Sequence, residues 1–323
     1  MDNVTIFLWK KDESYMTNRI VITGPTGAVG MALIHKSIAE GSEVLAICHR
    51  GSQRNKQIPK HPLITIWETE LEELGRIDYL IEKEYNVFYH LAWKGTFGDG
   101  RNNMPLQIEN IQYTVDAVKL AKRLGCHTFV GTGSQAEYGR VEGKLFPNTP
   151  AFPENGYGMA KLCAGQMSRV LCEQENIRHI WGRILSVYGP YDRGETMISS
   201  CLQKMLHGEA ADFTAGEQLW DYLYSEDAAE ALWLLGQKGR NGKVYCIGSG
   251  KAAPLKEYIQ KMHALTGEQS KLRFGAIPYA KGQVMELCAD ISALTEDTGF
   301  VPKTSFEEGI RKTIEWIKEN EEN

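Results

Sequence analysis

Residues 19–30 read RIVITGPTGAVG, and this stretch decides the fold. The first five residues are a short run rich in β-branched apolar side chains, which is typical of a buried strand. Gly24, Gly27 and Gly30 then follow at the spacing G-x-x-G-x-x-G, and residues 31–39 continue with the apolar period of a helix. Strand, glycine turn and helix in this order predict the first unit of a dinucleotide-binding sheet.

Each glycine of this turn has a physical role in such a site. Gly24 supplies the tight turn, Gly27 lets the backbone approach a pyrophosphate, and Gly30 allows the helix to pack closely. The helix N-terminus faces the anion with its free amide groups. A merely structural turn is the alternative, but the turn lies directly after a strand and opens a helix, as a cofactor site requires. The predicted cofactor contacts are Gly24, Thr26, Gly27, Ala28, Val29 and Gly30.

Further strand and helix signals alternate along the first half of the chain. Parallel strands need crossover connections, so this alternation predicts an α/β fold with a doubly wound parallel sheet, the Rossmann fold. Ligands of such sheets bind at the carboxyl ends of the strands. The predicted strands are residues 44–48, 63–67, 87–92, 128–131 and 177–184, and the long predicted helices are residues 106–124 and 157–174.

The alternation loosens beyond Gly189 and Pro190. We therefore expect an N-terminal extension over residues 1–17, a Rossmann domain over 18–188, and a smaller α/β domain over 189–323 that mainly binds substrate. Some of its segments are expected to return to the first domain. Its predicted helices are residues 197–206, 227–235 (capped by Ser225 or Asp227), 254–266 and 306–319, and its predicted strands are 218–224 and 244–247.

The composition excludes several classes of protein. With 42% hydrophobic and 24% charged residues, the 323-residue chain can bury a globular core. The 36 Lys and Arg against 41 Asp and Glu form no long basic block, so we expect no nucleic-acid partner. Seven cysteines without a C-x-x-C pair predict a reduced, cytoplasmic protein and no metal site. The apolar run at residues 4–9 is too short for a signal peptide or a membrane span.

Tyr157 and Lys161 stand four residues apart at the start of a predicted helix, on one face. An ammonium group there would favour the phenolate and lower the pKa of Tyr157, which gives an acid/base usable near neutral pH. Thr132 and Ser134, at the end of a predicted buried strand upstream, point the same way if the strand continues. Alternatives are a solvated helix pair and hydroxyl groups that only cap the next turn.

Together these motifs resemble those of the extended short-chain dehydrogenases/reductases of the sugar-nucleotide epimerase, dehydratase and ketoreductase type. The resemblance covers nearly the whole chain from residue 18, with the motifs in the family's order. They are residues 23–30, 90–92, Asn110, 134–139, 157–161, 183–190, 221–227, 309–310 and Trp316.

The resemblance implies that a hydride passes between a nicotinamide C4 and a hexose C4. Tyr157 is then the proton donor or acceptor, Ser134 hydrogen-bonds the sugar oxygen, and Lys161 holds the nicotinamide ribose. Thr132 and Ser134 together form a small oxyanion site. A homodimer is also implied, through a four-helix contact of residues 106–124 and 157–174. Further cofactor contacts implied are Leu91, Ala92, Asn110, Thr132, Tyr157 and Lys161.

Two positions bear on which reaction of the family the chain carries out. Dehydratases of the family have an Asp-Glu pair directly after the catalytic hydroxyl residue, where this chain has Gln135 and Ala136. Neither can act as acid or base, so dehydration is disfavoured. Glu137 follows, on a strand that is expected to turn its side chain away.

The end of the second strand bears on the cofactor. An acidic residue there would bind the ribose 2′-hydroxyl of NAD, whereas this chain has His49, Arg50 and Arg54, which could hold a 2′-phosphate. We expect NADP, with NAD possible, and Arg50 as the more important arginine. An NADPH-dependent 4-ketoreductase of a nucleoside-diphosphate 4-keto-6-deoxyhexose is therefore the leading hypothesis. The alternatives are an NAD-dependent nucleotide-sugar 4-epimerase and a non-catalytic Rossmann sensor.

The predicted substrate end departs from the family pattern. Trp93, Ser186 and Trp220 replace a small residue, an Asn and a pyrophosphate-binding Arg, respectively. The two tryptophans could shape the sugar pocket or stack on a base, or simply belong to the core. Lys281 is the candidate replacement cation for the phosphates. The predicted substrate contacts are Trp93, Ser134, Ser186, Trp220 and Lys281.

Overall fold

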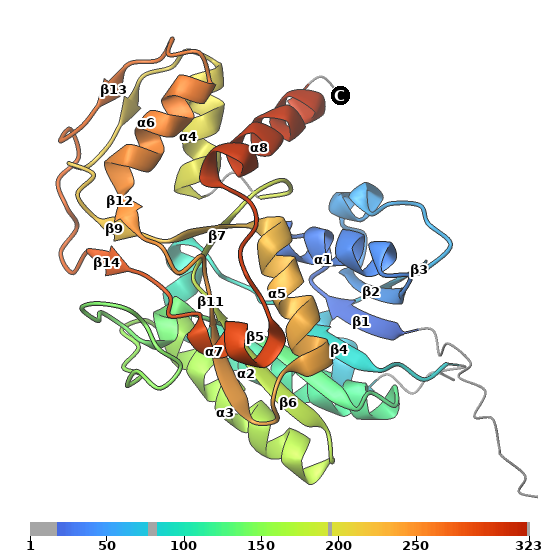
Figure 1. Cartoon of the computed structure of the whole chain (residues 1–323). Coiled ribbons are helices and arrows are strands. Elements are labelled where there is room, and N and C mark those ends of the chain that lie inside the picture. Colours follow the sequence, from blue (N-terminus) through green and yellow to red (C-terminus); the bar gives the residue numbers. More distant parts are fainter. Residues whose placement is uncertain (1–17, 77–82, 193–195, 322–323) are drawn as a thin grey trace, which may run out of the picture.

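The computed structural model describes residues 18–76, 83–192 and 196–321, and they form a central sheet of seven parallel strands. The strand order is β11-β6-β5-β4-β1-β2-β3, with the crossover between β1 and β4 (Figure 1). This is the doubly wound α/β arrangement predicted from the sequence. The strands are β1 (Arg19–Thr23), β2 (Glu43–His49), β3 (Ile64–Thr69), β4 (Val87–His90), β5 (Thr128–Ser134), β6 (Arg178–Ile184) and β11 (Lys243–Ile247).

Helices cover both faces of the sheet because successive side chains of its strands point to opposite sides. Ile20 and Ile22 of β1 face one apolar core, and Val21 faces the other. Helices α1 (Ala28–Ala39) and α5 (Ser225–Lys238) close the first core, together with α7 (Ser292–Thr298). Helix α2 (Met104–Arg123) closes the second and packs along α3 (Gly156–Gln174).

A third apolar core lies outside the sheet, in the C-terminal half of the chain. It joins α4 (Met197–Leu206), α6 (Leu255–Leu265) and α8 (Phe306–Glu321), which are grouped at one end of the molecule, away from α2 and α3 (Figure 1). The short parallel strands β8 (Ala211–Asp212) and β13 (Leu272–Arg273) flank this group. From the same half of the chain, β11 and α5 pack into the main sheet.

The strand predicted over residues 218–224 is in fact two short strands, β9 (Leu219–Trp220) and β10 (Tyr222–Tyr224), with Asp221 between them. They pair with different partners. Strand β9 lies between β12 (Ala253–Pro254) and β14 (Glu286–Leu287), whereas β10 pairs with β7 (Ser186–Tyr188). The division follows from Asp221, whose carboxylate is fully buried and accepts hydrogen bonds from the backbone of three other residues.

The predicted cap of the helix after β10 is also wrong. Helix α5 begins at Ser225 with Tyr224 at its N-cap position, and no side chain caps it. Asp227 is instead buried and accepts hydrogen bonds from the backbone amides of Lys303 and Thr304, 3.2 and 2.9 Å away. Its carboxylate therefore holds the chain segment that leads into α8.

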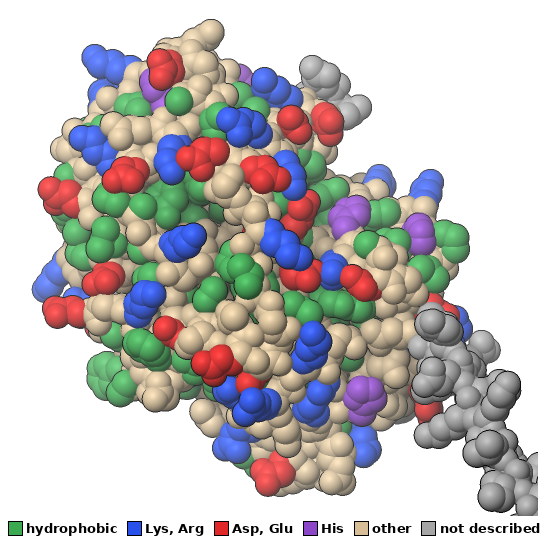
Figure 2. Space-filling view, viewed as in Figure 1, with side chains coloured by type: hydrophobic (Ala, Val, Ile, Leu, Met, Phe, Trp, Pro, Cys, Tyr) green, Lys and Arg blue, Asp and Glu red, His purple; other side chains and the backbone are tan. Residues whose placement is uncertain are grey.

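Charged side chains of both signs are mixed on the surface. Figure 2 shows Lys and Arg interspersed with Asp and Glu on the face in view, without a continuous basic patch. Among the described helices, none is both long and apolar enough to cross a membrane. The predicted N-terminal extension, residues 1–17, lies outside the described residues.

Candidate functional site

The glycine turn lies between β1 and α1, against the end of β4. Gly24 has φ +70°, and a Cβ on it would lie 2.8 Å from the backbone nitrogen of Ala92. A Cβ on Gly30 would lie 2.3 Å from the Gly24 carbonyl oxygen. Both glycines are therefore required by the turn's own packing, as the sequence pattern indicated.

Gly27 differs because no described residue would crowd a side chain at this position. Its φ of −85° suits any residue, and a Cβ would meet only the Gly24 carbonyl oxygen, 3.9 Å away. Gly27 is also the N-cap residue of α1, and no side chain bonds the first amides of that helix. A free helix N-terminus beside an uncrowded glycine fits a pyrophosphate. The turn thus has the form of a dinucleotide cradle.

A cavity of about 280 Å³ opens beside the turn, at the carboxyl ends of β1, β2, β3 and β4. Its walls include Thr26, His49, Arg54, Ala92 and Trp93, all but Arg54 among the predicted site residues. The cavity has the place and the lining for the adenosine half of a dinucleotide.

The two arginines after β2 have different surroundings. Arg50 is exposed and makes a two-point contact with Glu73, with N–O distances of 2.6 and 3.2 Å. This contact lowers the pKa of Glu73 to about 2. Arg54 is half-buried, lines the cavity and donates to the backbone carbonyls of Thr26 and Tyr191. Arg54, rather than Arg50, is therefore the arginine at the cofactor cavity.

Sequence reasoning missed one carboxylate at this cavity. Glu70 follows β3, lines the cavity, and lies 3.2 Å from the Nε2 of His49. The signal was available in principle, because β2 and β3 are adjacent and parallel, with His49 paired to Thr69. An acidic residue one position beyond a paired strand end reaches the same edge of the sheet.

Ser134, Tyr157 and Lys161 meet at the end of β5. Ser134 is the last residue of β5, and Tyr157 and Lys161 lie on the first two turns of α3, which Asn155 caps by accepting from the Gly158 amide. The Ser134 hydroxyl lies close enough to Tyr157 to act on the pKa of its phenol, which it lowers. Lys161 donates to the Thr132 carbonyl oxygen over 2.7 Å. The three side chains predicted to be catalytic therefore form one cluster.

Burial dominates the electrostatics of this cluster. It lowers the pKa of Lys161 to about 7, with Glu137 partly opposing it. Burial also raises the pKa of Tyr157, although the Ser134 hydroxyl and the charge of Arg101 act in the other direction. The expected lowering of the Tyr157 pKa by Lys161 is thus wrong, since desolvation disfavours the phenolate more than nearby charges favour it.

Two further side chains flank Tyr157. The Trp93 ring meets it edge-on, with centroids 6.1 Å apart, and the Lys161 Nζ lies 3.8 Å from the Trp93 centroid. Trp93 therefore packs on the catalytic pair. The guanidinium carbon of Arg101 lies 4.5 Å from the Tyr157 ring centroid. Arg101 was not predicted from the sequence. It lies in the short connection between β4 and α2, where no periodic pattern indicates which way a side chain points.

Thr132 and Asn110 both bond backbone groups at the end of β4 or just after it. The Thr132 hydroxyl donates to the His90 carbonyl oxygen over 3.0 Å, so it does not form an oxyanion pair with Ser134. Asn110 is buried, accepts from the Lys94 amide and donates to the Lys94 carbonyl, each over 2.9 Å. Its side chain fixes the chain that follows β4.

Glu137 does not lie on a strand. Gln135–Glu137 form a 3₁₀ turn, and the Glu137 carboxylate is fully buried against Arg183, with an N–O distance of 2.6 Å. The same carboxylate accepts from the Ser134 amide and the Trp181 indole. The prediction that Glu137 lies on a strand was therefore wrong. Its carboxylate bonds other groups of the protein.

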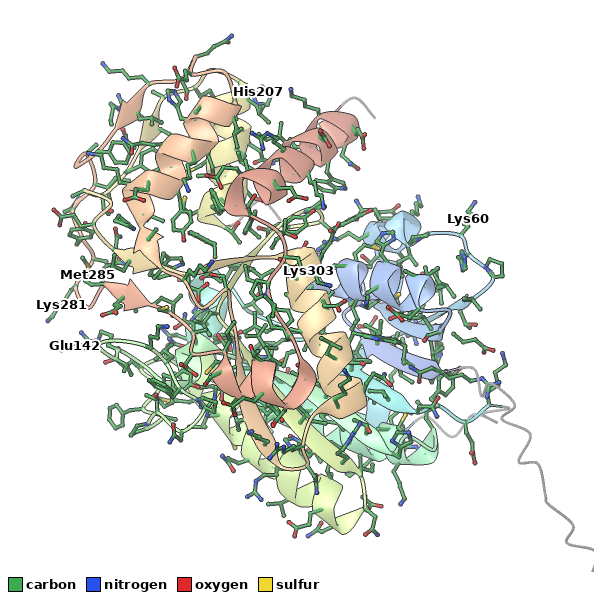
Figure 3. All side chains as sticks on the ribbon, in the orientation of Figure 1. Lys60, Glu142, His207, Lys281, Met285 and Lys303 are labelled. Atoms are coloured by element: carbon green, nitrogen blue, oxygen red, sulfur yellow. The ribbon has the colours of Figure 1, made fainter. Side chains whose placement is uncertain are left out.

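Ser186 and Trp220 are in direct contact, and Lys281 lies on an exposed segment. The Trp220 indole donates to the Ser186 hydroxyl over 2.8 Å, and the Trp220 ring packs against a small apolar cluster that includes Leu145 and Leu287. Lys281 is exposed at the margin of the molecule beside Met285 and Glu142 (Figure 3).

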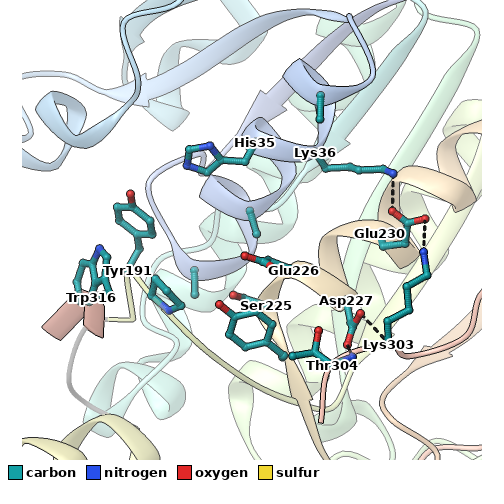
Figure 4. Close-up of a pocket in the computed structure, with 15 residues that line it drawn as sticks. His35, Lys36, Tyr191, Ser225, Glu226, Asp227, Glu230, Lys303, Thr304 and Trp316 are labelled. Atoms are coloured by element: carbon teal, nitrogen blue, oxygen red, sulfur yellow. Dashed lines mark hydrogen bonds and ion pairs between the residues drawn. The ribbon is translucent and has the colours of Figure 1, made fainter. Parts of the chain in front are cut away.

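A second cavity, of about 580 Å³, lies away from the catalytic cluster, between α1, α5 and the chain around Tyr191, Lys303 and Trp316. Figure 4 shows Glu230 of α5 bonded to both Lys36 and Lys303 across its rim. Neither Tyr157 nor Lys161 lines this cavity.

Comparison with known proteins agrees with this geometry. The model of the NAD dependent epimerase/dehydratase family matches residues 20–248. CDP-abequose synthase of Salmonella muenchen is 26% identical over 312 residues, 93% of this chain and 98% of that protein. The dTDP-glucose 4,6-dehydratase of Mycobacterium tuberculosis H37Rv is 22% identical over 313 residues, 94% of each chain.

Two solved structures have the same fold. UDP-glucose 4-epimerase of Thermotoga maritima superposes with a TM-score of 0.81 at 23% identity, over 94% of this chain and 99% of that one. The dTDP-glucose 4,6-dehydratase of Bacillus anthracis, solved in complex with NAD, gives 0.80 at 21% identity, over 95% and 98%. With its glycine cradle and its Ser134, Tyr157 and Lys161 cluster, the chain is an enzyme of the NAD-dependent epimerase/dehydratase family.

Proposed function

We propose that this enzyme is an NADPH-dependent 4-ketoreductase that acts on a nucleoside-diphosphate 4-keto-6-deoxyhexose. The observation that carries the proposal is the composition of the site around Tyr157. A proton donor, its hydroxyl partner and a lysine are in place, whereas the positions after Ser134 offer no free acid or base. Gln135 and Ala136 cannot titrate, and Glu137 is held by Arg183. A dehydratase would need such a group; a reductase does not.

The electrostatics of Tyr157 suit the reductive direction. Its raised pKa keeps the phenol protonated at neutral pH, ready to give its proton to a ketone oxygen. Ser134, whose hydroxyl lies close to the same phenol, can orient that oxygen. Lys161, with a pKa of about 7, can gain a proton as negative charge develops on Tyr157.

The cofactor would be held by residues already described. The backbone amides of Gly27 and Ala28, at the N-terminus of α1, would bind the pyrophosphate. Arg54, in the wall of the cavity, would bind a 2′-phosphate. When bound, the nicotinamide supplies the hydride. Lys161, beside Tyr157, is placed to hold its ribose, as the family resemblance implies.

The similarity to CDP-abequose synthase supports a cytidine diphosphate sugar as the substrate. The test is to follow the loss of reduced-nicotinamide absorbance with NADPH and a CDP-linked 4-keto-6-deoxyhexose. Turnover is expected with the parent. Tyr157→Phe should reduce it by about 10²- to 10⁴-fold, the usual range for loss of a general acid, while binding NADPH as the parent does. Unchanged turnover in Tyr157→Phe would contradict the role given to this residue.

An NAD-dependent 4-epimerase is the second candidate, and Glu70 favours it. A carboxylate in the adenosine cavity, paired with His49, is suited to ribose hydroxyls and repels a phosphate. Protein denatured directly after purification would then release NAD, and it would interconvert a sugar pair without added cofactor. The reductase proposal predicts neither result.

We also propose that the enzyme is a cytoplasmic homodimer. All seven cysteines are free, which suits a reducing compartment. Helices α2 and α3 pack against each other and still expose apolar side chains at helical spacing. Those on α3 are Met159, Met167 and Val170, and those on α2 are Met104 and Ile108. A second copy of the chain would cover this surface.

A further inference from the structure

The loop between β4 and α2 places Arg101 on the ring of Tyr157. Arg101 belongs to a 3₁₀ turn, Gly98–Asn102, and its guanidinium carbon lies 4.5 Å from the ring centroid. One guanidinium nitrogen donates to the Thr96 carbonyl oxygen over 3.1 Å. The side chain is half-buried, so its charge acts on the ring through little water.

The loop is tied down on both sides of Arg101. Gln107 of α2 donates to the carbonyl oxygens of Gly95 and Gly100, over 2.9 and 2.8 Å. Asn102 accepts from the amide of Gly156, the first residue of α3, over 3.1 Å. A Cβ on Gly156 would lie 3.0 Å from the Arg101 carbonyl oxygen, so the loop and the start of α3 touch. Arg101 is therefore held over the same helical turn that carries Tyr157.

Three charged groups from different elements surround the Tyr157 phenol. Arg101 comes from the loop before α2, Glu137 from the turn after β5, and Lys161 from α3 itself. The Lys161 Nζ bonds the Thr132 carbonyl oxygen and lies 6.0 Å from the Tyr157 centroid. Because a guanidinium remains protonated at any pH of interest, Arg101 is the permanent cation at this ring.

Resting on the proposed function, we infer that Arg101 is a positioning residue that holds the Tyr157 ring and stabilises the phenolate left after proton donation. The proton passes from the Tyr157 Oη to the carbonyl oxygen of the sugar, and the O–H electron pair remains on the phenol oxygen. Arg101 faces the ring in both states. Its attraction is stronger for the negatively charged ring, so it favours the donation.

The test uses Arg101→Gln, which removes the charge, and Arg101→Lys, which keeps it without the planar contact. The first readout needs no substrate. The ultraviolet absorbance of tyrosinate is titrated in each protein, and the same titration of a version that also carries Tyr157→Phe is subtracted. We expect the Tyr157 midpoint to rise by about 0.5 to 1 pH unit in Arg101→Gln and by less in Arg101→Lys.

Arg123→Gln is the matched control. Arg123 is also an arginine that donates to a backbone carbonyl, that of Leu74, but it lies at the far end of α2, about 30 Å along the helix. The Tyr157 midpoint should not move in this variant. Equal thermal stability of Arg101→Gln and the parent would show that a shift is not caused by partial unfolding.

The second readout is the pH profile of ketosugar reduction. Since the donor must be protonated, the rate falls as pH rises through the Tyr157 pKa, and this fall should move to higher pH in Arg101→Gln. We also expect kcat at neutral pH to drop by about 10-fold, with KM changed less than about threefold. An unmoved midpoint in a folded Arg101→Gln, or a change in KM alone, would overturn the inference. A parent without turnover on any ketosugar would instead refute the proposed function.

Discussion

At the scale of single residues, Lys161 shows how the site departs from the most stable arrangement. The side chain is 4% exposed, and burial lowers its pKa from 10.5 to about 7. Its partners are a backbone carbonyl and the Trp93 ring, and no carboxylate among the described residues forms an ion pair with it. Burial of a lysine in this way destabilises the folded state, and the proposed role of Lys161 in the reaction accounts for its presence.

Lys161→Met should therefore abolish activity and change the pH dependence of stability. Between about pH 7 and 10.5 the unfolded parent binds a proton at Lys161 that the folded parent does not, so the parent gains stability as pH rises. The variant lacks this gain. The free energy of unfolding of the variant minus that of the parent should therefore be largest at pH 7 and decrease toward pH 10. Urea titrations of both proteins at each pH measure this difference. Exposed Lys119→Met should show no such trend; a flat difference for Lys161→Met would contradict the assignment.

Arg54 and Arg50 lead to a second prediction at this scale. Arg54 lines the cofactor cavity and Arg50 contacts Glu73, so only Arg54→Gln should weaken NADPH binding relative to NADH. Loss of one charge-assisted contact of about 1.5 to 3 kcal/mol corresponds to roughly 10- to 100-fold in the ratio of dissociation constants. Calorimetry of both nucleotides on each variant measures it. A parent that prefers NADH would favour the epimerase.

At the scale of elements, α2 and α3 combine two tasks. Their inner faces pack on the sheet and on each other, and the first turns of α3 carry Tyr157 and Lys161. Their outer faces expose Ile108 by 65% and Met167 by 48%. Apolar residues repeated on the outside of two neighbouring helices are typical of an interface.

Ile108→Arg combined with Met167→Glu should therefore convert the dimer into a monomer. The reason is that each substitution would bury a charge in the proposed interface. Because both subunits of a symmetric dimer carry the substitution, each charge would be buried twice. Sedimentation equilibrium of the purified protein is expected to give half the mass of the parent. Val301→Arg, at an exposed apolar residue outside these helices, is the control and should leave the mass unchanged. A parent that is itself monomeric would refute the interface.

At the scale of the whole molecule, Asp221 joins segments that lie far apart in the sequence. Its buried carboxylate accepts from the amides of Ser249, Gly250 and Ala289, over 2.8, 3.1 and 3.0 Å, and from the Ser249 hydroxyl. The bonds connect the segment between β9 and β10 with the chain after β11 and the chain after β14. The carboxylate thus fixes the C-terminal half of the chain against the sheet.

Asp221→Ala should lower the free energy of unfolding by about 2 to 4 kcal/mol, because several buried amides would lose their acceptor. Denaturant titration measures the change. Asp212→Ala, which removes an exposed carboxylate paired with Arg273, should cost less than about 1 kcal/mol. Equal effects of the two substitutions would show that the buried carboxylate has no special role.

The sequence by itself determined the parallel sheet, the glycine turn and the grouping of Ser134, Tyr157 and Lys161. These depend on local patterns: buried strand runs, a fixed glycine spacing, and Tyr157 and Lys161 one helical turn apart. The order of the strands in the sheet was not predicted, because crossover rules restrict the possible orders without choosing one. Helix α4 was also predicted to the residue, because its apolar period begins and ends sharply.

Only the tertiary structure decided which partners the charged side chains take. Glu137 meets Arg183, Arg50 meets Glu73, and Arg101 meets Tyr157 across sequence separations that no local pattern reports. The direction of the Tyr157 pKa shift could not be predicted from the sequence either, because it depends on how several elements together bury the phenol. Electrostatic interactions depend on distances in space and on the exclusion of solvent. They can therefore be assigned only from the folded structure.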